Sequence, residues 1–298
     1  MSSPGRVATV ASRAGSRQLL VAGHVNVDHF LSVARIPGPD RTAPVVAERR
    51  ELGGTATNVA RSARRHGVSV GLLASVGDGF PPTFREVLDR EGIDLRGLTT
   101  VAGSPTPCCT ILEDRGGRTR TLIQQGPMGD SARHPLPGRW WRAYRWLHLG
   151  TGSPAHYLRL AEEARRDRRP VALDPAQEIF YRWDRVAFRR ILPLAEILFG
   201  NRAEVDHAAA WVGSRGVPSL LEHVPLVVRT EGPRGSTAFF RGGTVHVPSR
   251  APRRVRTFVG AGDAFRGGFY GGWFAGAPVA ECLRAGNRSA LDRIETGH

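Results

Sequence analysis

The 298-residue chain contains no lysine, so arginine supplies all 42 of its lysine-plus-arginine side chains. This absence excludes a P-loop, whose lysine reaches the nucleotide phosphates, and it excludes the strand lysine of protein kinases. It also excludes Schiff-base chemistry, which needs a lysine amine. Any reaction here must therefore use carboxylates, histidines, backbone amides or arginine.

The chain is also poor in cysteine and has no long apolar run. Its three cysteines include the adjacent pair Cys108 and Cys109, which is unsuited to a structural disulfide framework, so we expect a reducing cytoplasm. No segment approaches the roughly 20 apolar residues of a membrane span, so no membrane is expected among the partners. Residues 1–17 carry arginines without an apolar core, which predicts a flexible N-terminal tail and not a signal peptide.

The formal net charge of +15 raises nucleic acid as a partner. The arginines, however, are spread over the whole chain in short groups, such as Arg61, Arg64 and Arg65. Groups of this kind are typical of solvated helix faces. We therefore do not expect a nucleic-acid interface.

Apolar runs alternate with amphipathic segments along most of the chain, which predicts an α/β fold with a mainly parallel central sheet and helices on both faces. Two β-like segments near residues 30–52 and 106–125 interrupt this rhythm and predict a small β appendage on a single domain of residues 18–298. The expected strands are 19–22, 69–74, 146–149, 170–173, 197–199 and 226–228. The expected helices are 56–66, 83–90, 155–166 and 202–211.

The most informative segment is Gly260-Ala261-Gly262-Asp263, which stands directly before an apolar, helix-like stretch. Small residues at a helix start let several backbone amides point to one place, and the helix dipole adds positive potential there. Such a segment predicts an anion hole, and Asp263 at its rim could accept a proton from an attacking hydroxyl. The alternative is an ordinary loop in which Asp263 caps the helix.

A second set of polar residues follows the first predicted strand and opens the next helix. Asn26, Asp28 and Asn58 offer donors and acceptors suited to sugar hydroxyls, and Gly53-Gly54 lets a ligand approach the backbone. Carboxyl ends of strands are where α/β sheets bind ligands. Two later segments also follow strands, and they are 201–204 and 230–236.

In this order, these segments resemble the ribokinase-like (PfkB) family of sugar and nucleoside kinases, from about residue 19 to residue 287. The resemblance implies a three-layer α/β sandwich with a β-lid. It also implies an ATP-dependent kinase that transfers the γ-phosphate to a hydroxyl of a sugar or nucleoside and uses Mg²⁺. Lids in this family also pair between subunits, so a homodimer through the lid is a possible partner arrangement.

The resemblance implies a role for each matched residue. Asp263 would be the catalytic base, and the amides of Gly260, Ala261 and Gly262 would stabilise the transferred phosphate. Glu204 would act near magnesium, through water. The acceptor would be bound by Asn26, Asp28, Gly53, Gly54 and Asn58, and the nucleotide by Asn201, Glu204, Thr230, Gly232, Gly235 and Asn287.

One position departs from the family. Thr257 stands where related kinases carry an acidic residue that helps hold a monovalent cation, so activation by potassium is left open. A nucleoside acceptor would need an apolar wall for its base, for which Phe30, Cys108 and Ile111 are candidates.

Three alternatives stay open. A sugar-phosphate kinase would bind the acceptor's phosphate through arginine, and the lid segments contain Arg41, Arg49, Arg50 and Arg120. A protein of the same fold could bind nucleotide or sugar without catalysis. A dinucleotide site at residues 150–155, with Asp174 one βαβ unit later, would leave the lid and the second glycine loop unexplained.

Overall fold

The computed structural model describes residues 17–133 and 138–297. The predicted tail lies outside the described residues except for Arg17, which begins the first strand. Among the described helices, none is both long enough and apolar enough to cross a bilayer.

The described body is built on a nine-stranded sheet in the order β13-β12-β11-β10-β9-β8-β1-β4-β5. Its strands are parallel from β5 to β11, and β12 and β13 add an antiparallel edge. The strands are β1 Arg17–Ala22, β4 Val70–Gly77, β5 Asp94–Val101, β8 Tyr144–Leu149, β9 Val171–Leu173, β10 Ile197–Asn201, β11 Leu226–Thr230, β12 Ser236–Phe240 and β13 Gly243–Val247.

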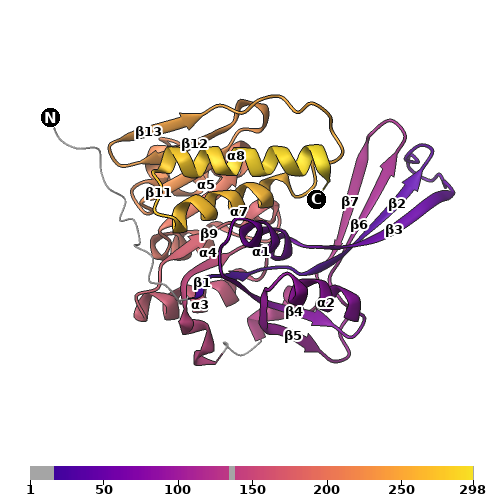
Figure 1. The fold of residues 1–298 in the computed structure, drawn as a ribbon, viewed down its shortest axis with the longest axis horizontal. Coiled ribbons are helices and arrows are strands. Elements are labelled where there is room, and N and C mark those ends of the chain that lie inside the picture. Colours follow the sequence, from indigo (N-terminus) through magenta and orange to yellow (C-terminus); the bar gives the residue numbers. More distant parts are fainter. Residues whose placement is uncertain (1–16, 134–137, 298) are drawn as a thin grey trace.

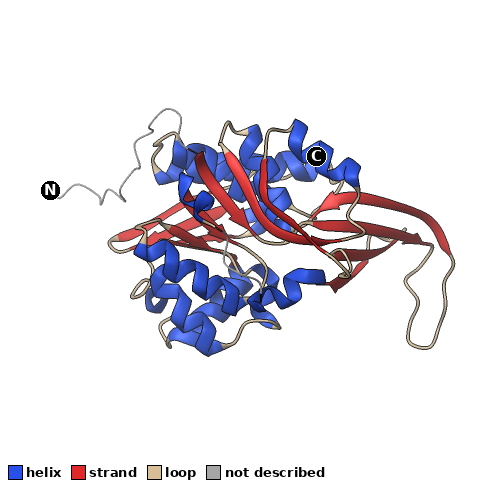
Figure 2. Cartoon of the chain, turned by 90° about the horizontal axis from the view of Figure 1, so that it is seen from below, coloured by secondary structure: helices blue, strands red, loops and turns tan. Residues whose placement is uncertain are grey.

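Helices cover both faces of this sheet and give three layers (Figure 2). Leu19 and Val21 of β1 belong to one buried cluster, whereas Leu20 and Ala22 belong to the other, because successive side chains of a strand point to opposite faces. The helices are α1 Thr55–Arg65, α2 Pro82–Arg90, α3 Pro154–Arg166, α4 Arg185–Ile191, α5 Arg202–Val212, α6 Val217–Leu220, α7 Ala261–Phe274 and α8 Val279–Thr296.

A separate four-stranded sheet projects from the body and forms the lid (Figure 1). Its order is β3-β2-β6-β7, with β2 and β6 parallel and both outer pairs antiparallel. The strands are β2 Asn26–Val33, β3 Val45–Gly53, β6 Cys108–Asp114 and β7 Thr119–Gln124. The lid therefore joins two segments far apart in the sequence.

Helix α7 packs closely between α1 and α8 on one face of the sheet (Figure 1). Its glycines allow this approach, because a Cβ at Gly267 would lie 2.2 Å from Ser62 Oγ and one at Gly268 would lie 2.5 Å from the carbonyl oxygen of Ala285. This packing fixes where the start of α7 lies relative to α1.

The predicted α/β architecture and the two β-like interruptions are confirmed. Each predicted strand and helix has a counterpart, with ends shifted by a few residues. The analysis of the sequence missed β5 and the antiparallel edge strands β12 and β13. The first lid segment also begins earlier than predicted, at Asn26 and not near residue 30.

Candidate active site

The segment Gly260–Asp263 forms the N-terminus of α7, as predicted. Gly260 has φ +78°, a left-handed conformation that favours glycine, and it precedes the first helical residue, Ala261. The amides of a helix's first turn have no partner inside the helix and point outward from its end. This end of α7 therefore has the chemistry of an anion hole.

Asp263 lies in the first turn of α7, where Asn58 of α1 holds it. The Nδ2 of Asn58 donates to Oδ2 of Asp263 at 2.9 Å, which joins residues 205 positions apart. Burial raises the pKa of Asp263 to about 6, although the bond from Asn58 and the charge of Arg266 oppose this shift. A carboxyl of that pKa is ionised and still a useful proton acceptor near neutral pH.

Asp28 enters the same region from β2. Its carboxylate lies directly over the α-carbon of Gly53, where a Cβ would come within 2.0 Å of Oδ2. Gly54 has φ +95°, and a Cβ there would lie 2.4 Å from the carbonyl oxygen of His24. Burial raises the pKa of Asp28 to about 7, and the charges of Asp263 and Glu51 raise it further. The two predicted carboxylates are thus electrostatically coupled.

Asn26 begins β2 and is paired with Gly53. It is buried, and its side-chain Oδ1 has no hydrogen-bond partner among the described residues. A buried acceptor without a partner is costly, and a ligand hydroxyl would satisfy it. The structure therefore gathers Asn26, Asp28, Gly53 and Gly54 at one place.

A buried ion pair that the analysis of the sequence missed lies behind the anion hole. Arg266 of α7 donates to both carboxylate oxygens of Asp174, from Nε at 2.6 Å and from a terminal nitrogen at 2.8 Å. Its other terminal nitrogen donates to the carbonyl oxygen of Gly262 at 3.0 Å. Arg266 therefore ties the first turn of α7 to the end of β9. The sequence feature that could have identified Arg266 is its position inside the glycine-rich segment, three residues after Asp263.

Four predicted nucleotide-binding residues line one cavity of about 210 Å³ beside the anion hole. They are Thr230, Gly232, Gly235 and Asn287, and Ala261 and Gly262 lie on the same wall. Phe258 and Leu291 give the cavity an apolar side. An apolar cavity beside an anion hole suits a base with phosphates attached.

Asn201 and Glu204 lie outside that cavity, at the start of α5. They form a capping box, in which the Asn201 side chain accepts from the Glu204 amide and Glu204 accepts from the Asn201 amide. Burial raises the pKa of Glu204, and the charge of Arg266 opposes the shift. The charges of Asp174 and Asp263 also act on Glu204, so it belongs to the same charged region.

The loop considered for a dinucleotide is already occupied by protein contacts. The Gly152 amide donates to Glu178 at 2.6 Å, and the Tyr157 hydroxyl donates to the carbonyl oxygen of Thr151. Asp174, the acidic residue of that pattern, is paired with Arg266. The structure therefore favours the anion hole over this alternative.

The inner face of the lid, which carries Asp28, combines apolar side chains of β6 and β7 with Glu51 and Arg49 of β3. Asp28 pairs with Cys109, and Cys109 pairs with Ile123, so the three side chains share one face of the sheet. Phe30 and Ile111 follow on the same face. Cys108 pairs with Val27 and lies on the opposite face, so its prediction as part of this wall is wrong. The register of β2 with β6, which could not be predicted from the sequence, determines that Cys109 and not Cys108 lies on the face of Asp28.

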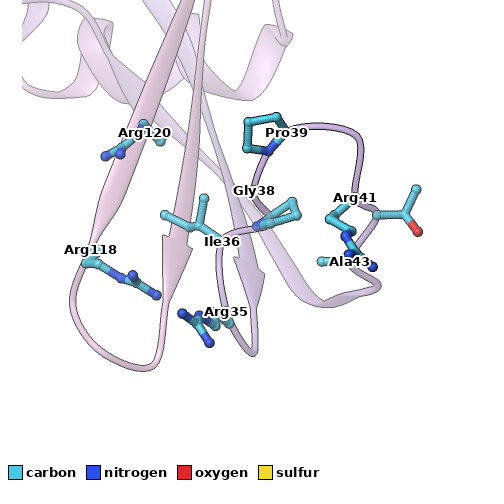
Figure 3. Close-up of a pocket in the computed structure, with 10 residues that line it drawn as sticks. Arg35, Ile36, Gly38, Pro39, Arg41, Ala43, Arg118 and Arg120 are labelled. Atoms are coloured by element: carbon cyan, nitrogen blue, oxygen red, sulfur yellow. The ribbon is translucent and has the colours of Figure 1, made fainter.

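The lid arginines do not gather around Asp28. Arg41 and Arg120 lie with Arg35 and Arg118 around a cavity of about 610 Å³ at the tip of the lid, as Figure 3 shows. Arg49 lies on the inner face, where its guanidinium covers Phe30 at 3.8 Å and bonds Glu113 at 2.6 Å and Glu51 at 2.9 Å. Its charge is therefore already paired.

Thr257 lies in the loop before the anion hole, and its hydroxyl accepts from the Val259 amide at 3.0 Å. It brings no carboxylate to this loop. Arg293 of α8 lies beside it and donates from Nε to the carbonyl oxygen of Val259 at 3.0 Å. A fixed positive charge therefore stands next to Gly260.

Comparisons of the sequence and of the fold with known proteins both lead to one family of kinases. The model of the pfkB family carbohydrate kinases matches residues 16–295. A nucleoside kinase of Methanothermobacter thermautotrophicus is 30% identical over 94% of this chain and 90% of its own length. An ATP-dependent ribose-1-phosphate kinase of Halopiger xanaduensis is 29% identical, over 91% and 89%. The crystal structure of the Methanocaldococcus jannaschii nucleoside kinase, an archaeal member of the ribokinase family, is 24% identical and has the same fold, with a TM-score of 0.86 over 94% of this chain and 93% of that one.

The raised pKa values of the carboxylates predict a pH-dependent stability. Both groups hold their protons more tightly in the folded chain, so they cost no stability below about pH 4 and oppose folding as the pH rises through their folded pKa values. We expect Asp28→Asn to raise the free energy of unfolding at pH 8 by up to about 4 kcal/mol. The gain should vanish toward pH 4.

Urea denaturation at both pH values measures this difference, and Asp89→Asn, at an exposed carboxylate on α2, is the matched control. An equal effect of Asp28→Asn at pH 4 and pH 8 would contradict the coupling of burial and charge described above.

Proposed function

Because the chain belongs to the pfkB family of carbohydrate kinases, it is an ATP-dependent phosphotransferase acting on a hydroxyl of a sugar or nucleoside, and we propose that its acceptor is a nucleoside held beneath the lid. The proposal places both sheets in a single kinase domain, residues 18–298. It assigns acceptor binding to Asn26, Asp28, Gly53, Gly54 and Asn58.

The observation that carries this proposal is the apolar part of the inner lid face, formed by β6 and β7 beside Asp28. Asp28 and Asn26 suit the ribose hydroxyls, while Cys109 and Ile123 would contact the base. A free sugar would leave this apolar surface in water. The nucleoside kinase from M. thermautotrophicus, 30% identical to this chain, supports the same choice.

A sugar-phosphate acceptor is the second candidate, because the H. xanaduensis relative is a ribose-1-phosphate kinase. Such an acceptor needs an uncompensated cation near Asp28. The inner lid face instead offers Arg49, which is already bound to Glu51 and Glu113, and Arg41 and Arg120 lie at the lid tip. The lid therefore favours an uncharged acceptor, and an acceptor phosphate would have to use Arg293 of α8, whose charge acts on Asp28.

In the proposed mechanism Asp263 accepts the proton of the attacking hydroxyl, and Asn58 orients its carboxylate. The amides of Gly260, Ala261 and Gly262 stabilise the charge of the transferred phosphate. Arg266 holds the first turn of α7 in place through the carbonyl oxygen of Gly262. The lid excludes water, which would otherwise compete as acceptor.

The nucleotide would occupy the cavity lined by Thr230, Gly232, Gly235 and Asn287, with its phosphates toward α7. Magnesium, when bound, would neutralise phosphate charge. Glu204 fits magnesium binding through water. Burial raises the pKa of its carboxyl, and a nearby cation would stabilise the ionised carboxylate. The described residues contain no group of three metal-ligating side chains, so water and phosphates would supply most ligands, as Mg²⁺ prefers.

Two further parts of the proposal concern a monovalent cation and the location in the cell. Because Thr257 brings no carboxylate, we include no monovalent cation in the mechanism. The three cysteines are all unpaired, which supports a cytoplasmic location.

Removing the proposed base tests the chemistry. We expect Asp263→Asn to lower kcat by about 10²–10⁴-fold, the usual contribution of a general base, with the Kd for ATP changed less than about twofold. Steady-state ADP release and equilibrium nucleotide binding measure the two quantities. Asp89→Asn is the control, and near-normal turnover in Asp263→Asn would remove Asp263 from this role.

The acceptor is tested by a panel of nucleosides, ribose and ribose 1-phosphate under equal conditions. We expect kcat/KM for the preferred nucleoside to exceed that for ribose by about 10- to 100-fold, because burying an apolar ring contributes about 1.5–3 kcal/mol. Ile123→Asn should reduce this ratio, whereas Leu122→Asn, on the opposite face of β7, should leave it unchanged. Preference for ribose 1-phosphate would establish the second candidate instead.

We also propose a homodimer through the outer face of the lid, where Leu122 is 72% exposed and Val46 is 57% exposed. Sedimentation equilibrium should give a dimer for the natural chain and a monomer for Leu122→Asn. Ile123→Asn, which alters the inner face, should remain dimeric. A natural chain that is monomeric at micromolar concentration would refute this association.

A further inference from the structure

A second cavity of about 210 Å³ lies between α1 and α8, beside the start of α7. Its lining includes Arg61 and Arg65 from α1 and Ser289 and Arg293 from α8. It shares no lining residue with the nucleotide cavity. The proposed function uses two of its lining residues, Asn58 and Gly260, but places no ligand in this cavity.

The charges around this cavity are not balanced. Glu91 binds the Arg61 guanidinium at 2.6 Å, so that charge is paired. Arg293 donates to the carbonyl oxygens of Val259 and Gly297, which take two of its five N–H hydrogens and carry no net charge. Within the described ranges no ion pair joins Arg65 or Arg293 to a carboxylate, and Asp292 is the one acidic residue of the lining.

The arginines are close enough to repel one another. Burial lowers the pKa of Arg293, and the charges of Arg61 and Arg65 lower it further, although Glu51 and Asp263 oppose this. Burial also lowers the pKa of His66, on the same lining, and the charges of Arg288 and Arg65 lower it further, although Asp292 opposes this. Clustered like charges around one cavity favour an anion inside it.

The two serines of the lining are bonded to each other. The Ser62 and Ser289 hydroxyls lie 3.1 Å apart, and Ser62 also donates to the carbonyl oxygen of Ala264 at 3.0 Å. Since Ser62 gives its one hydrogen to that carbonyl, Ser289 donates to Ser62, and the donors left for a ligand are the guanidinium groups. A tetrahedral oxyanion accepts several guanidinium N–H bonds at once and matches their geometry.

We propose that the cavity between α1 and α8 is a second oxyanion site, which takes inorganic phosphate or the terminal phosphate group of a small metabolite between Arg65 and Arg293. The site adjoins the anion hole at Gly260, whereas Ala261 and Gly262 line the nucleotide cavity. Its inner wall is formed by Asn58 and Gly260, so a bound oxyanion lies next to the residues that hold Asp263.

The test is phosphate binding by the full-length protein without nucleotide, measured by calorimetry at constant ionic strength with chloride as the balancing salt. We expect saturable binding of inorganic phosphate. Arg65→Gln should raise its Kd by about 10-fold or more, as expected for loss of one charge-assisted contact. Arg189→Gln, which removes an exposed charge on α4, should leave the Kd unchanged.

A second ligand, glycerol 3-phosphate, separates the two sources of phosphate. Binding of both ligands that depends on Arg65 assigns the site to a terminal phosphate group, and binding of inorganic phosphate alone assigns it to the free ion. Arg65→Gln should keep its kcat in phosphate-free buffer within about twofold, so failure of this site is distinguishable from failure of the kinase proposal. Phosphate binding no tighter than that of chloride, or unchanged in Arg65→Gln, would overturn the inference.

Discussion

The ion pair between Arg266 and Asp174 is the contact on which the geometry of the site depends. It connects a helix to the end of a central strand deep in the protein, with two short bonds and almost no solvent exposure. Removing either partner alone would leave a buried charge, a loss of about 3–5 kcal/mol in comparable cases. The pair also extends to His148, whose Nε2 lies 3.7 Å from Asp174 and whose Nδ1 lies 2.8 Å from the Tyr270 hydroxyl. The position of α7 is therefore determined by a polar network as well as by apolar packing.

Helices α1 and α8 pack on either side of α7, and all three helices contribute to the site. Helix α1 contributes Asn58, α7 contributes Asp263, and α8 contributes Arg293, and the glycines of α7 let the other two helices come close. One cavity lies on each side of the start of α7, and the two differ in character. The cavity proposed for the nucleotide is largely apolar, whereas the one between α1 and α8 is lined by arginine and serine. Close helix packing thus produces two cavities of different chemistry a few residues apart.

Local patterns were sufficient to predict the layers of the fold and much of the polar cluster, because both depend on residues near each other in the sequence. The Gly260–Asp263 segment carries its own helix start, and alternation of apolar runs indicates the sheet. Two things could not be predicted. The Arg266–Asp174 contact joins residues 92 positions apart, and nothing local to Asp174 signals it. The choice of Cys109 over Cys108 depends on the pairing of β2 with β6, since a shift of one residue moves every side chain to the other face.

The hydrogen bond between Asn58 and Asp263 spans 205 residues, and this has a consequence for the chain as it is synthesised. The glycine pair, Asp28 and α1 leave the ribosome long before the helix that packs on α1 and supplies Asp263. Until then α1 can pack on β1, β3 and β4, but the part of its buried face that α7 covers has no partner. Since contacts between distant segments also form slowly, this apolar surface stays exposed while the residues between α1 and α7 are synthesised. A site built from segments this far apart thus leaves apolar surface open to chaperones during translation.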